Sequence, residues 1–237
     1  MHGDEILTIA EMYRADALAI AGGISGFTLM DNAGHGITRE ILERWAPCPV
    51  TILCGPGNNG GDGFVVARLL KAHGWPVTLA LLGAIEKLCG DAAAHAARWD
   101  GDILACTPEV IAHAGLVVDA LFGAGLSKPV GGAAAATLQA AAGKGLPLVA
   151  VDMPSGVQGD TGEILGSAVP TALTVSFFRP KLGHFLYPGR GLIGELKIVD
   201  IGIPETVLAE IKPRHRVNQR DAWRPALPQP QVMGHKY

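Results

Sequence analysis

Short, continuously apolar runs alternate with longer stretches of helical periodicity along most of the chain. Four of these runs are predicted to be strands: residues 50–54, 77–82, 116–119 and 148–152. Apolar residues at helical spacing predict helices over residues 28–45, 64–73, 91–99 and 133–142. Strands that are apolar at every position are buried on both faces, and their alternation with helices favours a mostly parallel sheet covered on both sides. The pattern therefore predicts an α/β fold.

The two ends of the chain follow a different pattern. Thr8 and Glu11 have the spacing of a capping box, which predicts a helix from there to about Ala21. Residues 171–178 and 195–201 are strand-like, and we expect them to extend the same sheet. From Pro204 onward, several further prolines and the lack of apolar periodicity predict a linker.

Composition and charge narrow the class of protein. Of the 237 residues, 49% are hydrophobic and 17% are charged, which excludes an intrinsically disordered chain. The formal net charge is −3 without a cluster of Lys and Arg, so nothing indicates a nucleic-acid partner. The N-terminus lacks the basic start and apolar run of a signal peptide, and no suitable stretch is long enough to span a membrane. We expect a cytoplasmic protein with reduced cysteines and no membrane partner.

Three loops that follow predicted strands carry oxygen-bearing side chains, and in an open parallel sheet a ligand lies at such loops. The first is Gly55-Pro56-Gly57-Asn58-Asn59-Gly60-Gly61-Asp62-Gly63, and the others begin at Asp119 and Asp152. The first loop has neither the dinucleotide-binding G-x-G-x-x-G pattern nor the ending of a P-loop. Its five glycines exceed what a tight strand-to-helix turn needs, so we expect its backbone N–H groups to face an anion.

The chemistry of these loops favours a hard cation. Asp119, Asp152, Asn59 and Ser155 offer carboxylate, amide and hydroxyl oxygens without sulfur or imidazole. If one carboxylate serves the cation, the other is free for proton transfer. Each aspartate could instead cap a helix, a role that Asp often fills.

Three further polar residues have two interpretations each. Asn32 borders the site or makes local bonds within a helix, and Arg179 and Lys181 meet a phosphate or are solvated. The sequence leaves these alternatives open.

Several spaced motifs together resemble the NAD(P)H-hydrate epimerase family, also called YjeF N-terminal domains. They are the first loop, residues 118–125, Asp152-Met153-Pro154-Ser155-Gly156, Lys181-Leu182-Gly183 and residues 199–204. The resemblance implies a Rossmann-like three-layer αβα sandwich. It implies an isomerase that interconverts the R and S epimers of hydrated NADH and NADPH (NADHX and NADPHX) at C6 of the nicotinamide ring, with a bound K⁺.

The resemblance also implies the site residues. Those expected to bind substrate are Asn58, Asn59, Gly60, Gly61, Asp62, Gly123, Ala124, Gly125, Leu126, Ser127, Lys128, Pro129 and Asp152. Asp152 is expected to be catalytic, as a carboxylate that moves a proton. Asn59, Asp119 and Ser155 are expected to hold the potassium ion.

The same resemblance predicts a domain organisation and partners. Residues 1–204 are expected to form the epimerase domain. Residues 205–237 are expected to form a linker and the start of a missing C-terminal dehydratase domain, because His235-Lys236-Tyr237 resembles that junction in two-domain members. A homodimer, fused to or working with an ADP- or ATP-dependent dehydratase, is implied.

Two other functions remain as alternatives. The first is a non-catalytic binding module like the apolipoprotein A-I-binding proteins of the same fold, since a fold does not guarantee an activity. The second is an ordinary NAD-dependent oxidoreductase, which the sequence of the first loop disfavours.

Overall fold

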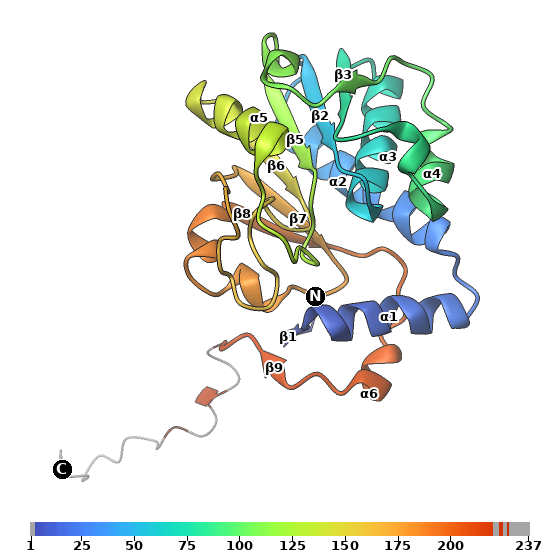
Figure 1. Ribbon diagram of the computed structural model, residues 1–237. Coiled ribbons are helices and arrows are strands. Elements are labelled where there is room, and N and C mark those ends of the chain that lie inside the picture. Colours follow the sequence, from blue (N-terminus) through green and yellow to red (C-terminus); the bar gives the residue numbers. More distant parts are fainter. Residues whose placement is uncertain (1–2, 220–222, 225–226, 228–237) are drawn as a thin grey trace, which may run out of the picture.

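A single seven-stranded sheet forms the centre of the molecule in the computed structural model, which describes residues 3–219, 223–224 and 227. The strand order is β4-β3-β2-β5-β6-β7-β8, and every neighbouring pair is parallel (Figure 1). The strands are β2 (Val50–Cys54), β3 (Val77–Leu81), β4 (Leu104–Ala105), β5 (Leu116–Ala120), β6 (Leu148–Val151), β7 (Leu173–Phe177) and β8 (Glu195–Val199). The predicted parallel sheet is confirmed.

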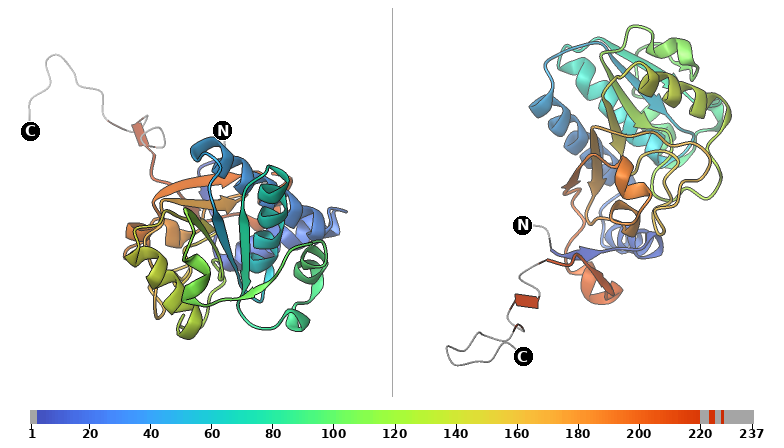
Figure 2. Two further views of the ribbon diagram at one scale, coloured as in Figure 1. Left: turned by 90° about the horizontal axis from the view of Figure 1, so that it is seen from above. Right: turned by 90° about the vertical axis from the view of Figure 1, so that its left-hand side faces the viewer.

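Helices cover both faces of this sheet. Three pack on one face, namely α2 (Gly26–Arg44), α3 (Asn58–Ala72) and α4 (Gly90–Ala96), while α5 (Gly132–Gly143) covers the other (Figures 1 and 2). Alternate residues of a strand feed two separate cores, as Ile52 and Leu53 of β2 do. The Rossmann-like three-layer sandwich is therefore confirmed.

The strand order reverses at the centre of the sheet. The chain passes from β2 outward to β3 and β4, and then returns to β5 on the other side of β2 before moving outward again. A crevice forms at the carboxyl ends of strands at such a switch point. Here it lies between the start of α3 and the loop that follows β5.

Helix α1 (Ile9–Ala21) lies beyond this carboxyl edge of the sheet (Figures 1 and 2). It begins with the predicted capping box: the Thr8 hydroxyl accepts from the Glu11 N–H at 3.2 Å, and the Glu11 carboxylate accepts from the Thr8 N–H at 2.8 Å. Just before it, β1 (Glu5–Ile6) pairs antiparallel with β9 (His215–Arg216).

The structure differs from the linker predicted after Pro204. The short helix α6 (Val207–Ile211) packs against α1, and Val207 and Ile211 join Ile203 in the main core. These residues recur every four positions, a helical spacing too short to detect among the prolines. The predicted start of a dehydratase domain at residues 235–237 lies outside the described residues.

All four cysteines are free thiols, with Cys54 and Cys106 buried and Cys89 exposed. Among the described residues, no helix is long and apolar enough to cross a bilayer.

Candidate active site

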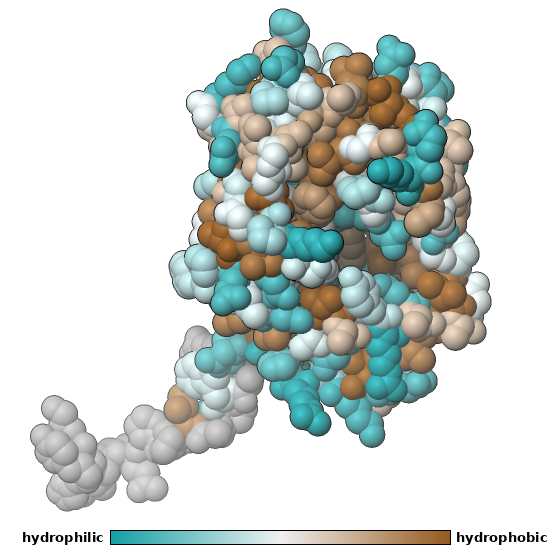
Figure 3. Space-filling view, in the orientation of Figure 1, coloured by the Kyte–Doolittle hydropathy of each residue, from teal (hydrophilic) through white to brown (hydrophobic). Residues whose placement is uncertain are grey.

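A cavity of about 490 Å³ opens at the carboxyl edge of the sheet, between α1 and the body of the domain. Figure 3 shows its mouth as a hollow on this face of the molecule. Its walls come from α1, α2, the start of α3, the loop after β5 and the end of β6. Its chemically active side chains are Tyr13, Asp16, Asn58, Asn59, Asp62, Asp91, Asp152 and Lys181.

The glycine-rich loop is shorter than the sequence predicts. Helix α3 begins at Asn58 rather than at Phe64, with Gly57 as its N-cap. The glycines allow close packing: a Cβ on Gly60 would collide with the carbonyl oxygen of Gly55, and one on Gly63 would lie 2.8 Å from the Cys54 sulfur. The first turn of α3 is therefore pressed against the sheet, and its free N–H groups lie at the crevice.

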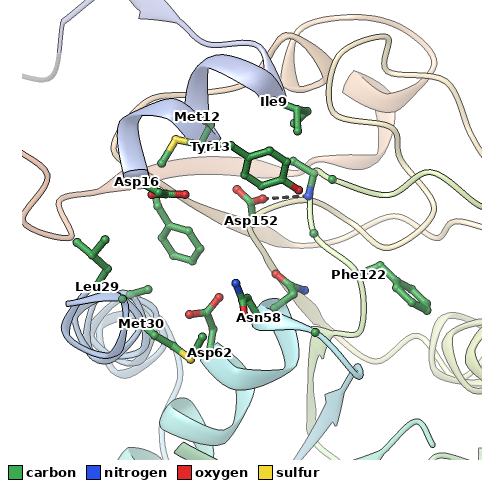
Figure 4. Close-up of a pocket in the computed structure, with 18 of the residues that line it drawn as sticks. Ile9, Met12, Tyr13, Asp16, Leu29, Met30, Asn58, Asp62, Phe122 and Asp152 are labelled. Carbon is green, nitrogen blue, oxygen red and sulfur yellow. Dashed lines mark hydrogen bonds between the residues drawn. The ribbon is translucent and has the colours of Figure 1, made fainter. Parts of the chain in front are cut away.

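Asp152 follows β6 in an unusual backbone conformation. Its φ is 65°, and a hydrogen bond of 2.8 Å from the Met153 N–H to the Val151 carbonyl closes a γ-turn around it. Non-glycine residues rarely adopt such a φ, which is costly and occurs mainly at functional sites. The turn directs the carboxylate into the cavity (Figure 4).

Three donors hold the Asp152 carboxylate. Lys181 Nζ and Ser176 Oγ donate to Oδ1 at 2.8 and 2.9 Å, and the Ala124 N–H donates to Oδ2 at 2.9 Å. Burial alone would raise the pKa of Asp152, but the Lys181 ammonium and these hydrogen bonds lower it to about 2. Asp152 is therefore a fixed anion at neutral pH.

Lys181 is not solvated, because it is 2% exposed and ion-paired with Asp152 at the cavity. Arg179 is equally buried and pairs with Glu5 and Glu205 at 3.2 and 2.9 Å. The solvated interpretation is wrong for both residues, and the sequence did not reveal these partners because they are distant along the chain.

His184 supports the same arrangement. Its Nδ1 accepts from the Lys181 N–H at 2.9 Å, so its Nε2 carries the proton and donates to the Asp152 carbonyl at 2.8 Å. Burial and the Lys181 ammonium lower the pKa of His184 to about 4, which keeps the ring neutral. Neutral His184 thus links the backbone of Lys181 to the strained turn at Asp152.

Two other carboxylates in the cavity have raised pKa values. Burial and the neighbouring Asp152 and Asp16 raise the pKa of Asp62 well above its usual range. Burial raises the pKa of Asp16 to about 6, with Asp152 adding to the shift and Lys181 opposing it. The cavity therefore holds carboxyl groups of three different acidities.

Helix α1 contributes to the cavity, which the sequence patterns did not indicate. Its residues Ile9, Tyr13, Asp16 and Ile20 all line the cavity and are spaced four, three and four apart, so they form one stripe of the helix. The exposure of Tyr13 and Ile20, at 62% and 50%, marks this stripe as open to solvent. The spacing was visible in the sequence, but nothing in it placed α1 over the sheet edge.

Asp119 and Ser155 lie beneath the cavity. Fully buried Asp119 accepts from the Ser155 hydroxyl at 2.6 Å and from the Ser155 N–H at 2.9 Å. The Ser155 oxygen also accepts from the Phe122 N–H at 2.9 Å. Burial raises the pKa of Asp119, which the bonds from Ser155 partly offset. Asp119 lies within β5 and Asp152 in the γ-turn after β6, so neither fills the helix-capping role considered above.

Asn59 and Asp152 meet at Gly123. A Cβ on Gly123 would lie 2.9 Å from Asn59 Oδ1 and 3.1 Å from Asp152 Oδ2, so a larger side chain there would displace the ends of both side chains. The Asn59 side-chain nitrogen is buried without a hydrogen-bond partner among the described residues.

The structure brings most of the sequence-predicted substrate residues to the cavity. Those that line it are Asn58, Asn59, Asp62, Gly123, Ala124, Gly125, Leu126 and Asp152. Those outside its lining are Gly60, Gly61, Ser127, Lys128 and Pro129. Asn32 also lies outside the lining and donates to the Ile201 carbonyl at 2.8 Å, rather than to its own helix.

Comparison with known proteins identifies relatives over most of the chain. An "NAD(P)H-hydrate epimerase" from Rhodobacter capsulatus is 43% identical, over 79% of this chain and 95% of its own length. One from Limosilactobacillus fermentum is 33% identical, over 83% of this chain and 97% of its own length. A "Bifunctional NAD(P)H-hydrate repair enzyme Nnr" from Thermofilum pendens is 38% identical over 83% of this chain, which spans 40% of that relative.

A solved structure and a family profile agree with these relatives. The crystal structure of the yeast protein ynu0 has the same fold, with a TM-score of 0.70 and 20% identity over 92% of this chain and 98% of that one. The profile described as "YjeF-related protein N-terminus" matches residues 26–183, which include the glycine-rich turn, Asp119, Asp152 and Lys181. The chain therefore belongs to the family of YjeF-related N-terminal domains.

Proposed function

We propose that this chain is an isomerase that interconverts the R and S forms of hydrated NADH and NADPH. The observation that carries this proposal is the set of charged side chains in the cavity, whose described lining holds Asp16, Asp62, Asp91 and Asp152 but a single cation, Lys181. That lysine is already paired with Asp152. Such a site suits a reaction that passes through a positively charged ring. The relatives named NAD(P)H-hydrate epimerase support the same activity.

The chemistry of the substrate explains why an acidic cavity suits this reaction. Inversion at C6 follows if the hydroxyl leaves as water, with electrons from ring nitrogen N1 forming an iminium, and if water then adds to the other face. The iminium carries a positive charge that neither epimer has. A carboxylate fixed near the ring, as Asp152 is, stabilises this state more than either epimer, which lowers the barrier.

Asp152 suits a role as a charge partner of this iminium. Its carboxylate is held by Lys181, Ser176 and the Ala124 N–H, so it is in place before the ring becomes charged. Its low pKa makes it a poor proton carrier near neutral pH, because such a group works best when its pKa lies near the operating pH.

The remaining walls suit the rest of the substrate. Leu29, Met30 and Phe177 provide apolar surface for the nicotinamide ring. The free N–H groups at the start of α3 and the loop of residues 123–129 suit the phosphates, which bear negative charge that the acidic interior repels. Exposed Lys128 in that loop adds a cation outside the cavity.

A potassium ion would be held by Asn59, Asp119 and Ser155. These residues fit it, because carboxylate, hydroxyl and amide oxygens surround one turn, where the Phe122 carbonyl lies 3.2 Å from the Ser155 oxygen. The Asn59 side-chain nitrogen has no hydrogen-bond partner among the described residues, so its amide can turn toward a cation without losing a bond to them. When bound, the ion supplies fixed positive charge that orders these loops.

We also infer that the reaction serves a repair process with a second step on the same cofactor. Relatives named as bifunctional repair enzymes support this, and this chain spans 40% to 47% of three of them. We assign residues 1–204 to the epimerase domain. Residues 207–216, which include α6 and β9, pack onto it. A dehydratase, fused or separate, is the expected partner.

The proposed activity is tested with a single purified epimer. The R form of NADHX is incubated with the protein in potassium or sodium chloride, and both epimers are followed by chromatography. We expect the S form to appear faster than in buffer until the normal equilibrium is reached, with a higher rate in potassium. Binding of NADHX without any acceleration would instead identify a non-catalytic binding module.

A further inference from the structure

Epimerisation by loss and re-addition of water sets a geometric requirement. The hydroxyl leaves one face of the ring at C6, and the new water arrives on the opposite face. One group must therefore give a proton on one face while another accepts a proton on the other. If Asp152 is fixed by Lys181, the cavity must provide these groups elsewhere.

Two carboxyl groups lie on opposite walls of the cavity. Asp16 projects into it from α1, and Asp62 projects into it from the first turns of α3 (Figure 4). Within the described part of the chain, neither receives a hydrogen bond or an ion pair, unlike the three-donor arrangement at Asp152. Both are thus available to a ring that lies between the two helices.

We propose that Asp16 and Asp62 are the two proton-transfer residues of this site, each serving one face of the substrate ring. This inference rests on the proposed epimerase function. Asp16 lies in α1, before the region that the family profile matches, and the sequence patterns give it no role.

The proton balance of the cycle is closed. In one direction, protonated Asp62 gives its proton to the C6 hydroxyl, the C6–O bond breaks, and water leaves as the iminium forms. A water on the other face then bonds to C6 and gives its proton to ionised Asp16. The product leaves with Asp16 protonated and Asp62 ionised, which is the form required for the reverse reaction. Proton exchange with solvent restores the starting form.

One proton-transfer residue on each face of the ring predicts a result that a purely structural role of Asp16 and Asp62 does not. When one carboxyl group is removed, inversion stops, but the other can still release and return water on its own face. Asp16→Asn should therefore exchange the C6 oxygen of one epimer with ¹⁸O-labelled water without inverting it. Asp62→Asn should do the same for the other epimer.

The experiment compares wild type, both variants and Asp100→Asn as a matched control, using each purified epimer of NADHX in ¹⁸O-labelled water. Asp100 is exposed and pairs with Lys71, and neither residue belongs to the cavity lining. We expect both variants to invert the substrate at least ~100-fold more slowly than wild type, the lower end for loss of a proton-transfer group. We also expect each to exchange oxygen into a different epimer faster than buffer does.

The possible results distinguish a wrong assignment of Asp16 and Asp62 from a wrong proposed function. Thermal unfolding and binding of NADHX confirm that each variant is folded and retains its cavity. Inversion by Asp16→Asn within about threefold of wild type would overturn the assignment, as would loss of oxygen exchange for both epimers in both variants. A wild-type protein that inverts neither epimer would instead overturn the proposed function. Asp16→Glu, which keeps the carboxyl group, should recover part of the rate.

Discussion

The side chain of Asp152 shows how a single residue is prepared for a reaction. Its positive φ, the γ-turn at the end of β6 and the bond from His184 to its carbonyl fix the backbone. Lys181 and Ser176 fix the carboxylate. Backbone strain of this kind costs about 1–3 kcal/mol and persists only where the surroundings enforce it. Asp152 was predictable from its loop, whereas Lys181 was not, because only the fold brings residues 29 positions apart into contact.

Removing the partner of Asp152 gives a prediction at this scale. Lys181→Met leaves a buried carboxylate without its cation, which should destabilise the protein by about 3–5 kcal/mol at neutral pH. The lowered pKa of Asp152 stabilises wild type above pH ~4, and this contribution is lost as the pH falls toward 2. The variant should not lose this stabilising contribution as the pH falls. Denaturant unfolding between pH 7 and 3 measures it, with Lys144→Met as an exposed control, and an unchanged pH dependence would contradict the ion pair.

Ionisation of Asp16 is expected to change the free energy of unfolding in the opposite direction from that of Asp152. Its pKa is raised to about 6, so its ionisation at pH 7 opposes folding. Asp16→Asn should therefore increase the free energy of unfolding by about 1–3 kcal/mol at pH 7, with the gain disappearing below pH ~4. Thermal unfolding of this variant and of Asp100→Asn tests the point. A destabilised Asp16→Asn at neutral pH would show that the carboxylate has a stabilising partner.

At the scale of elements, the start of α3 is the part that sequence reasoning described least well. The predicted loop of nine residues is a three-residue turn followed by two helical turns, because the glycines serve close packing as well as backbone freedom. Propensity disfavours glycine within a helix, so the pattern indicated a loop. Contact with β2 and the turn after β5 outweighs that preference. The central strands β2, β3, β5 and β6 were predictable because each is a largely apolar run, whereas β4 has only two residues and was not predicted.

A methyl group added at this contact tests the explanation. Gly63→Ala would place Cβ 2.8 Å from both Ala120 Cβ and the Cys54 sulfur, which should destabilise the protein by about 1–3 kcal/mol and lower activity. Gly143→Ala in α5 meets no neighbouring atom within 4 Å and should be neutral or stabilise by up to about 1 kcal/mol. Equal stabilities of the two variants would contradict the packing role.

On the scale of the whole molecule, the two ends of the chain jointly complete the site. The pairing of β1 with β9, the packing of α6 on α1, and the ion pairs of Arg179 with Glu5 and Glu205 hold α1 over the sheet edge. These ends lie outside residues 26–183, which the family profile matches. The sheet and its loops can be predicted from local sequence patterns. These contacts between segments distant in the sequence cannot.

The packing of α6 on α1 predicts that a change in α6 affects substrate binding in the cavity. Ile211→Ala removes a buried side chain of α6, 8% exposed, and should cost about 2 kcal/mol, mostly as local opening of α1. Amide hydrogen exchange in α1 should accelerate, and KM for NADHX should rise several-fold while the core strands stay protected. Exposed Glu210→Ala on the same helix is the control. Unchanged exchange in α1 would contradict the coupling.

Epimerisation within the acidic cavity is the central function proposed for this protein. The most direct measurement supplies a mixture of R and S NADPHX with a separate dehydratase that consumes only the S form, and follows depletion of the R form with wild type and Asp152→Asn. We predict that wild type removes the R form well above the spontaneous rate, and that Asp152→Asn does so at least ~100-fold more slowly while remaining folded. Depletion at the spontaneous rate with folded wild type, or equal depletion by both proteins, would contradict it.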